Sequence, residues 1–177
     1  AALDARGRPQ ALRMTVAGDA ITPRWIARNR PAWATRFDAP DKTAAEGFFD
    51  LPYAVPHQRI AQQATRSGVP IGYWRAVGHS HHAFFTECFI DELAHEAGQD
   101  PVAFRLSLLD RHPRFATVLK LAAEKAQWGR PLPPGRARGV ALHESFGSIV
   151  AEVMEVSLDN GRPRVHRVVC AIDCGTV

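Results

Sequence analysis

The chain has 177 residues, 46% of them hydrophobic and 23% charged, with a formal net charge of +4. This composition suits one globular domain with a buried core. It offers no membrane span, because no apolar run approaches the roughly 18 residues that a transmembrane helix needs. The spacings of the three cysteines fit neither a zinc motif, a disulfide framework nor an iron–sulfur cluster.

The positive charge is carried by arginines scattered along the chain rather than gathered in a basic stripe. A nucleic-acid interface pairs such a stripe with stacking aromatics, so we expect no nucleic-acid binding. The densest basic and aromatic stretch, residues 24–33, serves an anionic cofactor or an acidic neighbouring segment equally well. The chain lacks an initial methionine and stops straight after a strand-like run, so we expect a piece of a longer polypeptide.

Residues 1–58 show little periodicity, and we expect an irregular or extended segment of a larger domain there. An apolar run at residues 11–17 predicts one strand, which Gly18 and Asp19 end. Residues 20–58 are rich in proline and tryptophan and predict irregular connection with short extended pieces.

Residues 59–128 predict a strand at 60–66, an arginine-containing loop and three helices. The second helix starts with Asp100 as N-cap and Pro101 at its first position, and the third covers 114–127. The first helix covers 81–96, where a buried Cys88 belongs to the apolar face. That face comprises Phe85, Cys88, Phe89, Glu92 and Leu93.

The C-terminal part predicts a Pro/Gly linker at 129–137 and then strands with a hairpin at 138–177. The strands are expected at 138–144, 149–158 and 164–172, with a turn or bulge at 145–148. Asn160-Gly161 between extended runs is a strong hairpin signal, and valines on both faces predict a hairpin covered on both sides. The fold class predicted is α+β, a small mixed or antiparallel sheet with about three helices packed on it.

Chemistry is concentrated in the passage from strand to helix at residues 72–82, which holds two glycines, two aromatics, Arg75 and three histidines. Glycines let backbone amides approach a ligand closely, and helix N-termini favour anions. The spacing matches neither the P-loop nor the dinucleotide fingerprint. From the residues alone, Arg75 either contacts such a ligand or braces a turn through carbonyl hydrogen bonds.

The other polar clusters are better explained by structural roles than by a metal site or a catalytic site. His79, His81 and His82 do not share one helix face and lack a completing cysteine or acidic pair, so we expect helix capping or ligand contacts rather than a metal site. A divalent-metal site there stays an alternative. Glu152 and Glu155 face opposite sides of a strand, one paired with an arginine and one solvated. Adjacent residues 143–145 do not make a hydrolytic triad.

Two separated blocks carry a family resemblance. The first comprises GYWRAVGHSHHAFF at 72–85 and FIDELAHEAGQDPVAFR at 89–105, and the second comprises ALHESFGS at 141–148 and CAIDCG at 170–175. Together they resemble the molybdenum hydroxylases, in the molybdopterin-binding large subunit of the isoquinoline 1-oxidoreductase and aldehyde dehydrogenase branch of the xanthine dehydrogenase family. The resemblance covers residues 47–177 well and the first forty or so poorly.

The resemblance implies cofactor-binding roles for Trp74, Arg75, Ala76, Val77, Gly78, His79 and Ser80. In the family, a loop of the pattern aromatic-Arg-Gly-aromatic-Gly lies against the molybdenum centre. Here Ala76 replaces a glycine and Val77 replaces an aromatic that stacks on substrate, which puts purine-like stacking in doubt. The family's catalytic glutamate belongs to a Gly-Glu motif that these residues do not contain, so the resemblance implies no catalytic residue and no resident metal ligand in this chain.

The resemblance also implies an activity and its partners. It implies hydroxylation of an aldehyde or N-heteroaromatic carbon with oxygen derived from water, by a large subunit of which this chain is an inactive fragment. The cofactor would be molybdopterin, in the cytosine dinucleotide form, with its other binding loops outside this chain. Partners would be the rest of the large subunit, a small subunit with [2Fe-2S] clusters and a cytochrome acceptor. The location would be the bacterial periplasm or the cytoplasm, and the resemblance favours the periplasm. The alternative is a binding or structural module without cofactor.

Overall fold

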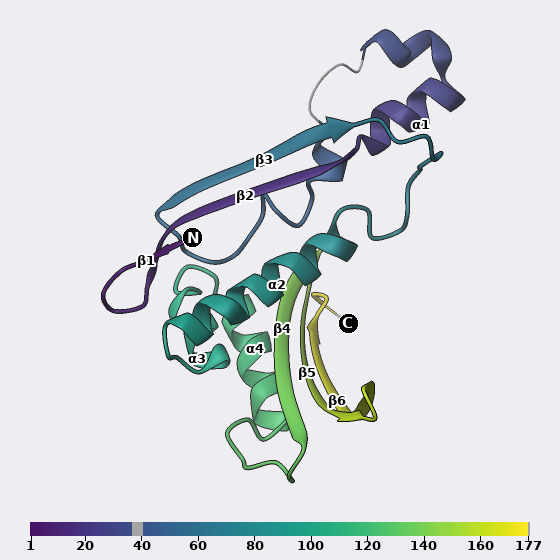
Figure 1. Cartoon of the computed structure of the whole chain (residues 1–177). Coiled ribbons are helices and arrows are strands. Elements are labelled where there is room, and N and C mark those ends of the chain that lie inside the picture. The colour runs from purple at the N-terminus through teal and green to yellow at the C-terminus, as the bar shows by residue number, and fades with distance from the viewer. Residues whose placement is uncertain (37–40, 177) are drawn as a thin grey trace. The chain divides into compact units, whose positions relative to one another are not determined.

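A three-stranded mixed sheet organises the first part of the chain in the computed structural model, which describes residues 1–36 and 41–176 (Figure 1). Strands β1 (Ala2–Leu3), β2 (Pro9–Asp19) and β3 (His57–Thr65) lie in that order. β1 pairs antiparallel with β2, and β2 pairs parallel with β3, Leu12 opposite Gln58. The strands predicted at 11–17 and 60–66 are confirmed, each in a longer or slightly shifted form.

Helix α1 (Ile21–Asn29) corrects the prediction of irregular chain over residues 20–58. Its N-terminal amides have no local side-chain cap. Instead the Asp41 carboxylate, far along the chain, accepts hydrogen bonds from Ile21 N at 2.5 Å and Thr22 N at 3.0 Å. A cap supplied by tertiary contact leaves no local sequence signal. Two 3₁₀ turns follow, at Pro31–Arg36 and Lys42–Ala44, while residues 37–40 of the same predicted segment lie outside the described residues.

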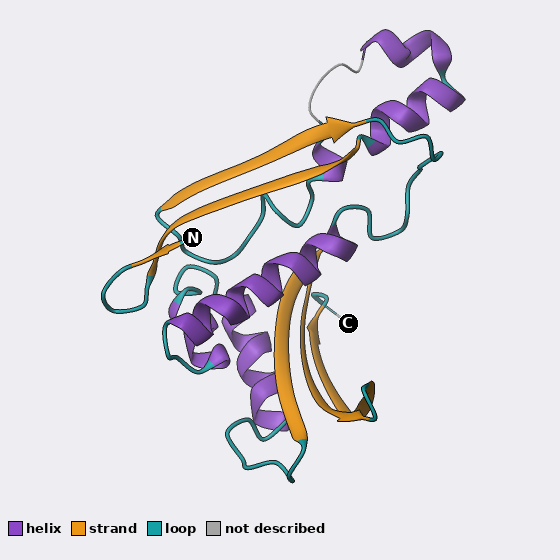
Figure 2. Ribbon diagram, viewed as in Figure 1, coloured by secondary structure: helices purple, strands orange, loops and turns teal. Residues whose placement is uncertain are grey.

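The second part of the chain is an antiparallel meander with helices against one face (Figure 2). Helix α2 (His79–Glu96) precedes α3 (Pro101–Ser107) and α4 (Pro113–Lys125), and strands β4 (Arg136–Ser145), β5 (Ser148–Asp159) and β6 (Arg162–Asp173) follow. The described residues thus hold four α-helices and two three-stranded sheets, which confirms the predicted α+β class. None of these helices has the length and apolarity to cross a bilayer.

Short-range sequence signals predicted the start of α3 and the turns between the C-terminal strands correctly. Asp100 Oδ1 caps α3 by accepting from Val102 N and Ala103 N at 3.0 and 2.9 Å. The predicted turns join β4 to β5 and β5 to β6, and Asn160 and Gly161 have the positive φ angles, 52° and 76°, that such a two-residue turn requires. β4 begins at Arg136, inside the predicted linker.

The meander is covered by α4 on one face only. Ile149, Ala151 and Val153 are buried on that face, whereas Met154, Val168 and Ile172 are exposed. The prediction that both faces are covered is therefore wrong for the residues that the structure describes.

Backbone contacts divide the chain into two compact units, Ala1–Leu51 with Val55–Thr86, and Pro52–Ala54 with Glu87–Val177. The four sequence segments predicted, 1–58, 59–128, 129–137 and 138–177, concern the organisation of a larger domain and stay a prediction.

The buried face of α2 agrees with the predicted one only in part. Leu93 is buried as predicted, but Cys88 and Phe85 are exposed, while Glu87 and Ile90, outside the predicted face, are buried. The prediction followed apolar residues, but the helix buries polar ones at several positions, and apolar periodicity does not register these.

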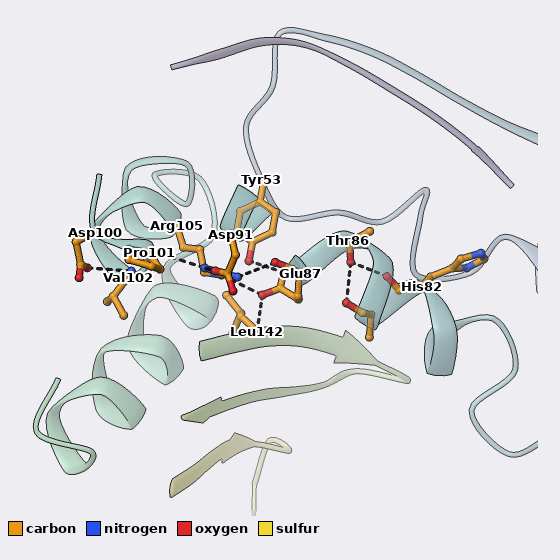
Figure 3. Close-up of polar contacts among 11 residues, drawn as sticks. Tyr53, His82, Thr86, Glu87, Asp91, Asp100, Pro101, Val102, Arg105 and Leu142 are labelled. Carbon is orange, nitrogen blue, oxygen red and sulfur yellow. Dashed lines mark hydrogen bonds and ion pairs between the residues drawn. The ribbon is translucent and has the colours of Figure 1, made fainter. Parts of the chain in front are cut away.

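A buried ion pair with Arg105 explains why Glu87 lies on the buried face of α2. The Arg105 side chain is 0% exposed (Figure 3). Arg105 donates from Nε to Glu87 Oε2 at 3.0 Å and from Nη1 to Asp91 Oδ1 at 2.6 Å. Its remaining donor contacts are the carbonyl oxygens of Glu87 and Pro101. The guanidinium therefore has partners on two helices.

Glu87 connects this pair to other elements of the second unit. Its carboxylate also accepts from Tyr53 Oη at 2.8 Å and from Leu142 N in β4 at 2.7 Å. Burial raises the pKa of Glu87 against the opposing effect of Arg105. Burial and the Glu87 charge also raise the pKa of Tyr53 well above its ordinary value, so its hydroxyl stays protonated and donates.

We expect Glu87→Gln to lower the free energy of unfolding by about 3 kcal/mol, because it removes the buried one of the two carboxylates that balance the Arg105 charge. Asp91→Asn is the matched control, since the Asp91 side chain is 41% exposed and its loss costs about 1 kcal/mol or less. Urea denaturation of both variants measures the difference. Equal losses would contradict the special role of Glu87.

Asp19, at the end of β2, organises the first unit in a similar way. Its carboxylate accepts from Ser67 N and Ser67 Oγ, both at 2.8 Å, from Thr65 Oγ1 at 3.0 Å and from Arg24 Nη2 at 3.0 Å. These bonds, the Ser67 hydroxyl first, lower its pKa from 3.8 to about 2.

Because this pKa is lowered on folding, the carboxylate stabilises the fold above pH 3.8, and that contribution is lost as the pH falls toward about 2. We therefore expect Asp19→Asn to lose stability at neutral pH and to show a shallower decline between pH 4 and pH 2 than the wild type. Denaturation curves across that range test this. Parallel declines would assign the acid sensitivity to other groups.

Candidate functional site

The predicted cofactor loop links β3 to α2 through two successive turns. Val77 N donates to Trp74 O at 3.1 Å, and His79 N donates to Ala76 O at 3.0 Å, after which the helix begins. Trp74 is 79% exposed, and Arg75 and Ser80 are exposed as well, whereas Gly78 and His79 are buried. The loop therefore projects Trp74 and Arg75 from a buried base.

The base of the loop packs so closely that only glycine fits at position 78. A Cβ there would lie 2.7 Å from Glu46 O and 2.9 Å from Thr43 O, both backbone atoms. The preceding Val77 has φ 47°, a left-handed conformation that a β-branched residue rarely adopts. The surrounding contacts therefore hold the loop in a strained conformation.

Helix α1 fixes the entrance to the loop. Arg28 Nη2 donates to Ile71 O, and Tyr73 Oη shares a 2.8 Å hydrogen bond with Thr22 Oγ1. The rings of Trp25 and Tyr73 pack edge to face at 5.9 Å. Sequence reasoning missed Arg28 and Tyr73 as loop anchors, because their partners come from a segment with no recognisable local pattern.

Arg75 itself does not brace the turn. Within the described residues its guanidinium has no hydrogen bond or ion pair, and it is exposed. The carbonyl-bracing alternative is therefore wrong for Arg75, and Arg28 performs that task instead. What remains at Arg75 is a permanent cation on a fixed loop, which suits an anionic or strongly polar group.

The three histidines have separate roles. His82 is fully buried, its Nδ1 lies 2.7 Å from Glu46 O, and its ring stacks on Phe48 at 3.8 Å. His79 is buried at the helix start, and partial burial lowers the pKa of His81. Among the residues that the structure describes, no group of three or more His, Cys, Asp or Glu side chains could hold a metal ion.

The strand glutamates face opposite sides of the sheet and one of them pairs with an arginine, as predicted, whereas the other is half-buried rather than solvated. Glu155 is buried and pairs with Arg138 at 2.9 Å. Glu152 lies opposite Cys170 on the other face of the sheet, so the two carboxylates do not converge.

The chemistry of the loop residues is compatible with the predicted cofactor contacts, which stay a prediction. Arg75 supplies positive charge, the Trp74 ring is exposed for stacking, and the absence of a Cβ at Gly78 allows the loop base to close. The other predicted contacts, Ala76, Val77, His79 and Ser80, lie on the same loop, where each stays a prediction.

We expect Gly78→Ala to lower the free energy of unfolding by about 1–3 kcal/mol, because backbone atoms must move to admit the methyl group. Gly72→Ala is the control on the same loop, since its Cβ would meet only the end of the Arg28 side chain at 3.4 Å. Thermal or urea unfolding of the pair measures the contrast. A tolerated Gly78→Ala would mean that the loop base is not rigid.

Comparison with known proteins found three bacterial relatives, and no family model matches the chain. The isoquinoline 1-oxidoreductase beta subunit of Brevundimonas diminuta is 35% identical over 182 residues, 100% of this chain and 23% of that protein. A nicotinate dehydrogenase subunit of Pseudomonas putida is 34% identical over 143 residues, 70% of this chain and 12% of that protein.

The third relative, the membrane-bound aldehyde dehydrogenase [pyrroloquinoline-quinone] of Gluconacetobacter polyoxogenes, is 30% identical over 128 residues, 60% of this chain and 16% of that protein. The chain thus spans less than a quarter of the relatives that it matches. The family resemblance of the two sequence blocks described above predicted relatives of this kind. The chain is therefore homologous to a segment of an isoquinoline 1-oxidoreductase beta subunit and to segments of two further bacterial dehydrogenases, consistent with the predicted fragment of a molybdenum hydroxylase family.

Proposed function

We propose that this chain is part of the molybdopterin-binding subunit of a molybdenum-dependent oxidoreductase, and that the Arg75 loop forms one wall of its active site. The observation that carries the proposal is Arg75, an exposed cation without an internal partner in the described residues, on a loop held by Gly78, Arg28 and Tyr73. Homology to two oxidoreductase subunits supports the reaction class.

The bound cofactor would supply the metal that accepts electrons from the substrate and delivers water-derived oxygen to an aldehyde or N-heteroaromatic carbon. This chain's contribution is positional and electrostatic. Arg75 would stabilise negative charge on a bound group, and the anchored loop would hold that charge in place before the ligand arrives. These residues contain no Gly-Glu motif like that of the family's catalytic glutamate, so we infer that they do not turn over substrate by themselves.

The same homology supports a set of partners. Two relatives are named as subunits, in line with an assembly of this chain with the rest of a large subunit, a [2Fe-2S] small subunit and a cytochrome acceptor. The cytosine dinucleotide form of the cofactor and a periplasmic rather than cytoplasmic location complete the proposal.

A second cofactor is worth testing because one relative's name specifies pyrroloquinoline quinone. The two cofactors differ in elemental composition, since only the molybdopterin cofactor carries molybdenum. Elemental analysis for molybdenum, together with a redox-cycling assay for bound quinone, on the whole protein purified with its native partners, separates them. A quinone without molybdenum would overturn our proposal in favour of the second cofactor, and the absence of both would favour a non-catalytic module.

We expect molybdenum near one atom per subunit in the wild type, and a fall in turnover of about 10²-fold or more in Arg75→Ala, the usual cost of removing one preorganised charge from an active site. Arg66→Ala, which removes another exposed arginine from the same unit, is the control and should retain activity. The measurements are metal content and an aldehyde and N-heterocycle turnover screen. If Arg75→Ala behaves like Arg66→Ala, the loop is not a wall of the site.

A further inference from the structure

Side-chain hydroxyl groups form a continuous series from the buried Asp41 to the surface of the first unit. Thr43 Oγ1 donates to Asp41 Oδ1 at 2.7 Å. Thr22 Oγ1 lies 2.9 Å from Thr43 Oγ1 and 2.8 Å from Tyr73 Oη. Asp41 is buried, whereas Tyr73 is exposed and its contact with Thr22 is open to solvent. The hydroxyl series therefore connects a buried carboxylate to a surface hydroxyl group at the entrance of the Arg75 loop.

The carboxylate fixes the direction of every hydrogen bond in the hydroxyl series. A hydroxyl group has one hydrogen, so Thr43, which donates to Asp41, has none left for Thr22. Thr22 must therefore donate to Thr43, and its oxygen accepts the hydrogen of Tyr73. The single hydrogen of the Tyr73 hydroxyl group is thus directed inward.

Tyr73 Oη is left as an acceptor at the solvent-accessible end of the series. A phenol oxygen that donates its hydrogen keeps its lone pairs, and no donor among the described residues uses them. An ordinary surface hydroxyl group rotates and serves donors and acceptors alike, whereas this one is held in a single role. A site with a fixed hydrogen-bonding role accepts ligands that match it and rejects analogues that do not.

An aromatic pair adjoins this acceptor. The Tyr73 ring packs edge to face against the ring of Trp25, which is itself exposed, with 5.9 Å between the centroids. Such a pair presents apolar ring surface beside a polar oxygen, which suits a flat molecule with one polar edge. Tyr73 directly precedes Trp74 and Arg75, so the acceptor belongs to the same anchored loop as the exposed cation.

We propose that Tyr73 Oη selects aromatic heterocycles that carry an N–H donor. The ring of the ligand would lie against Trp25 and Tyr73, and its N–H would donate to Tyr73 Oη. A heterocycle that offers only an acceptor nitrogen would bring lone pair against lone pair and bind poorly. This inference rests on the proposed function, because it narrows the substrates of the Arg75 loop to heterocycles that carry an N–H.

Three bicyclic probes test the selection, by ligand-observed NMR on the whole protein with its native partners. Indole carries an N–H donor, 1-methylindole has lost that donor, and quinoline carries only an acceptor nitrogen. We expect indole to bind about fivefold more tightly than 1-methylindole, the usual effect of one net hydrogen bond, and quinoline to bind no better than 1-methylindole. Tyr73→Phe should abolish the difference between indole and 1-methylindole.

Thr22→Val gives the sharpest test, because it removes the acceptor that holds the Tyr73 hydrogen. The freed hydroxyl group can then donate outward, so quinoline should bind about fivefold more tightly than to the wild type, while indole binding is retained. A merely structural role of Thr22 would instead weaken the binding of every probe. Thr22→Ser keeps the hydroxyl group and is the matched control, which should behave as the wild type.

Thr43→Val breaks the hydroxyl series one position further in, and it should produce the same gain for quinoline because Thr22 is then free to donate to Tyr73. It replaces Thr22→Val if thermal unfolding shows that the latter does not fold. The proposal is overturned by a wild type that binds indole no more tightly than 1-methylindole or binds no probe, or by a folded threonine-to-valine variant without a gain for quinoline.

The readout is binding rather than turnover, so it separates this inference from the proposed function. Selection for indole in a protein without molybdenum would remove the proposed molybdenum chemistry alone. Molybdenum near one atom per subunit without selection for indole would remove the role of Tyr73 alone.

Discussion

The buried charge of Arg105 is the constraint on which the second unit depends. A guanidinium without solvent exposure must find all its hydrogen-bond acceptors inside the protein. Glu87, Asp91 and the Pro101 carbonyl supply them, and Glu87 in turn accepts from Tyr53 and Leu142. Since a misplaced partner would leave a charge uncompensated, the geometry of two helices, a strand and the segment around Tyr53 is specified together.

The first unit reaches a defined structure by different means. Its loop is shaped by a missing side chain at Gly78 and by tertiary bonds from Asp41, Arg28 and Asp19. These contacts position Arg75 without engaging it. A cation held in this way needs little reorganisation when it meets a ligand, which is the property that electrostatic catalysis and tight anion binding share.

Features encoded by neighbouring residues could be predicted from the sequence. Asp100 before Pro101 located α3, and Asn160-Gly161 located the last hairpin, because each signal acts within one turn. Helix α1 and the buried face of α2 could not be predicted, because the Asp41 cap and the Arg105 counter-ion come from distant positions. For the candidate site, the loop was predicted from its resemblance, whereas the anchoring role of Arg28 emerged only from the tertiary structure.

The uncovered face of the meander has a consequence for handling the molecule. Met154, Val165, Val168 and Ile172 form an apolar strip on a sheet whose outer strands, β4 and β6, have no further strand beside them in the described residues. Such a surface recruits other strands and apolar chains from solution. A preparation of these 177 residues by themselves would therefore tend to self-associate through this face. Its solubility would fall with protein concentration and rise with added detergent, even while the fold stays intact.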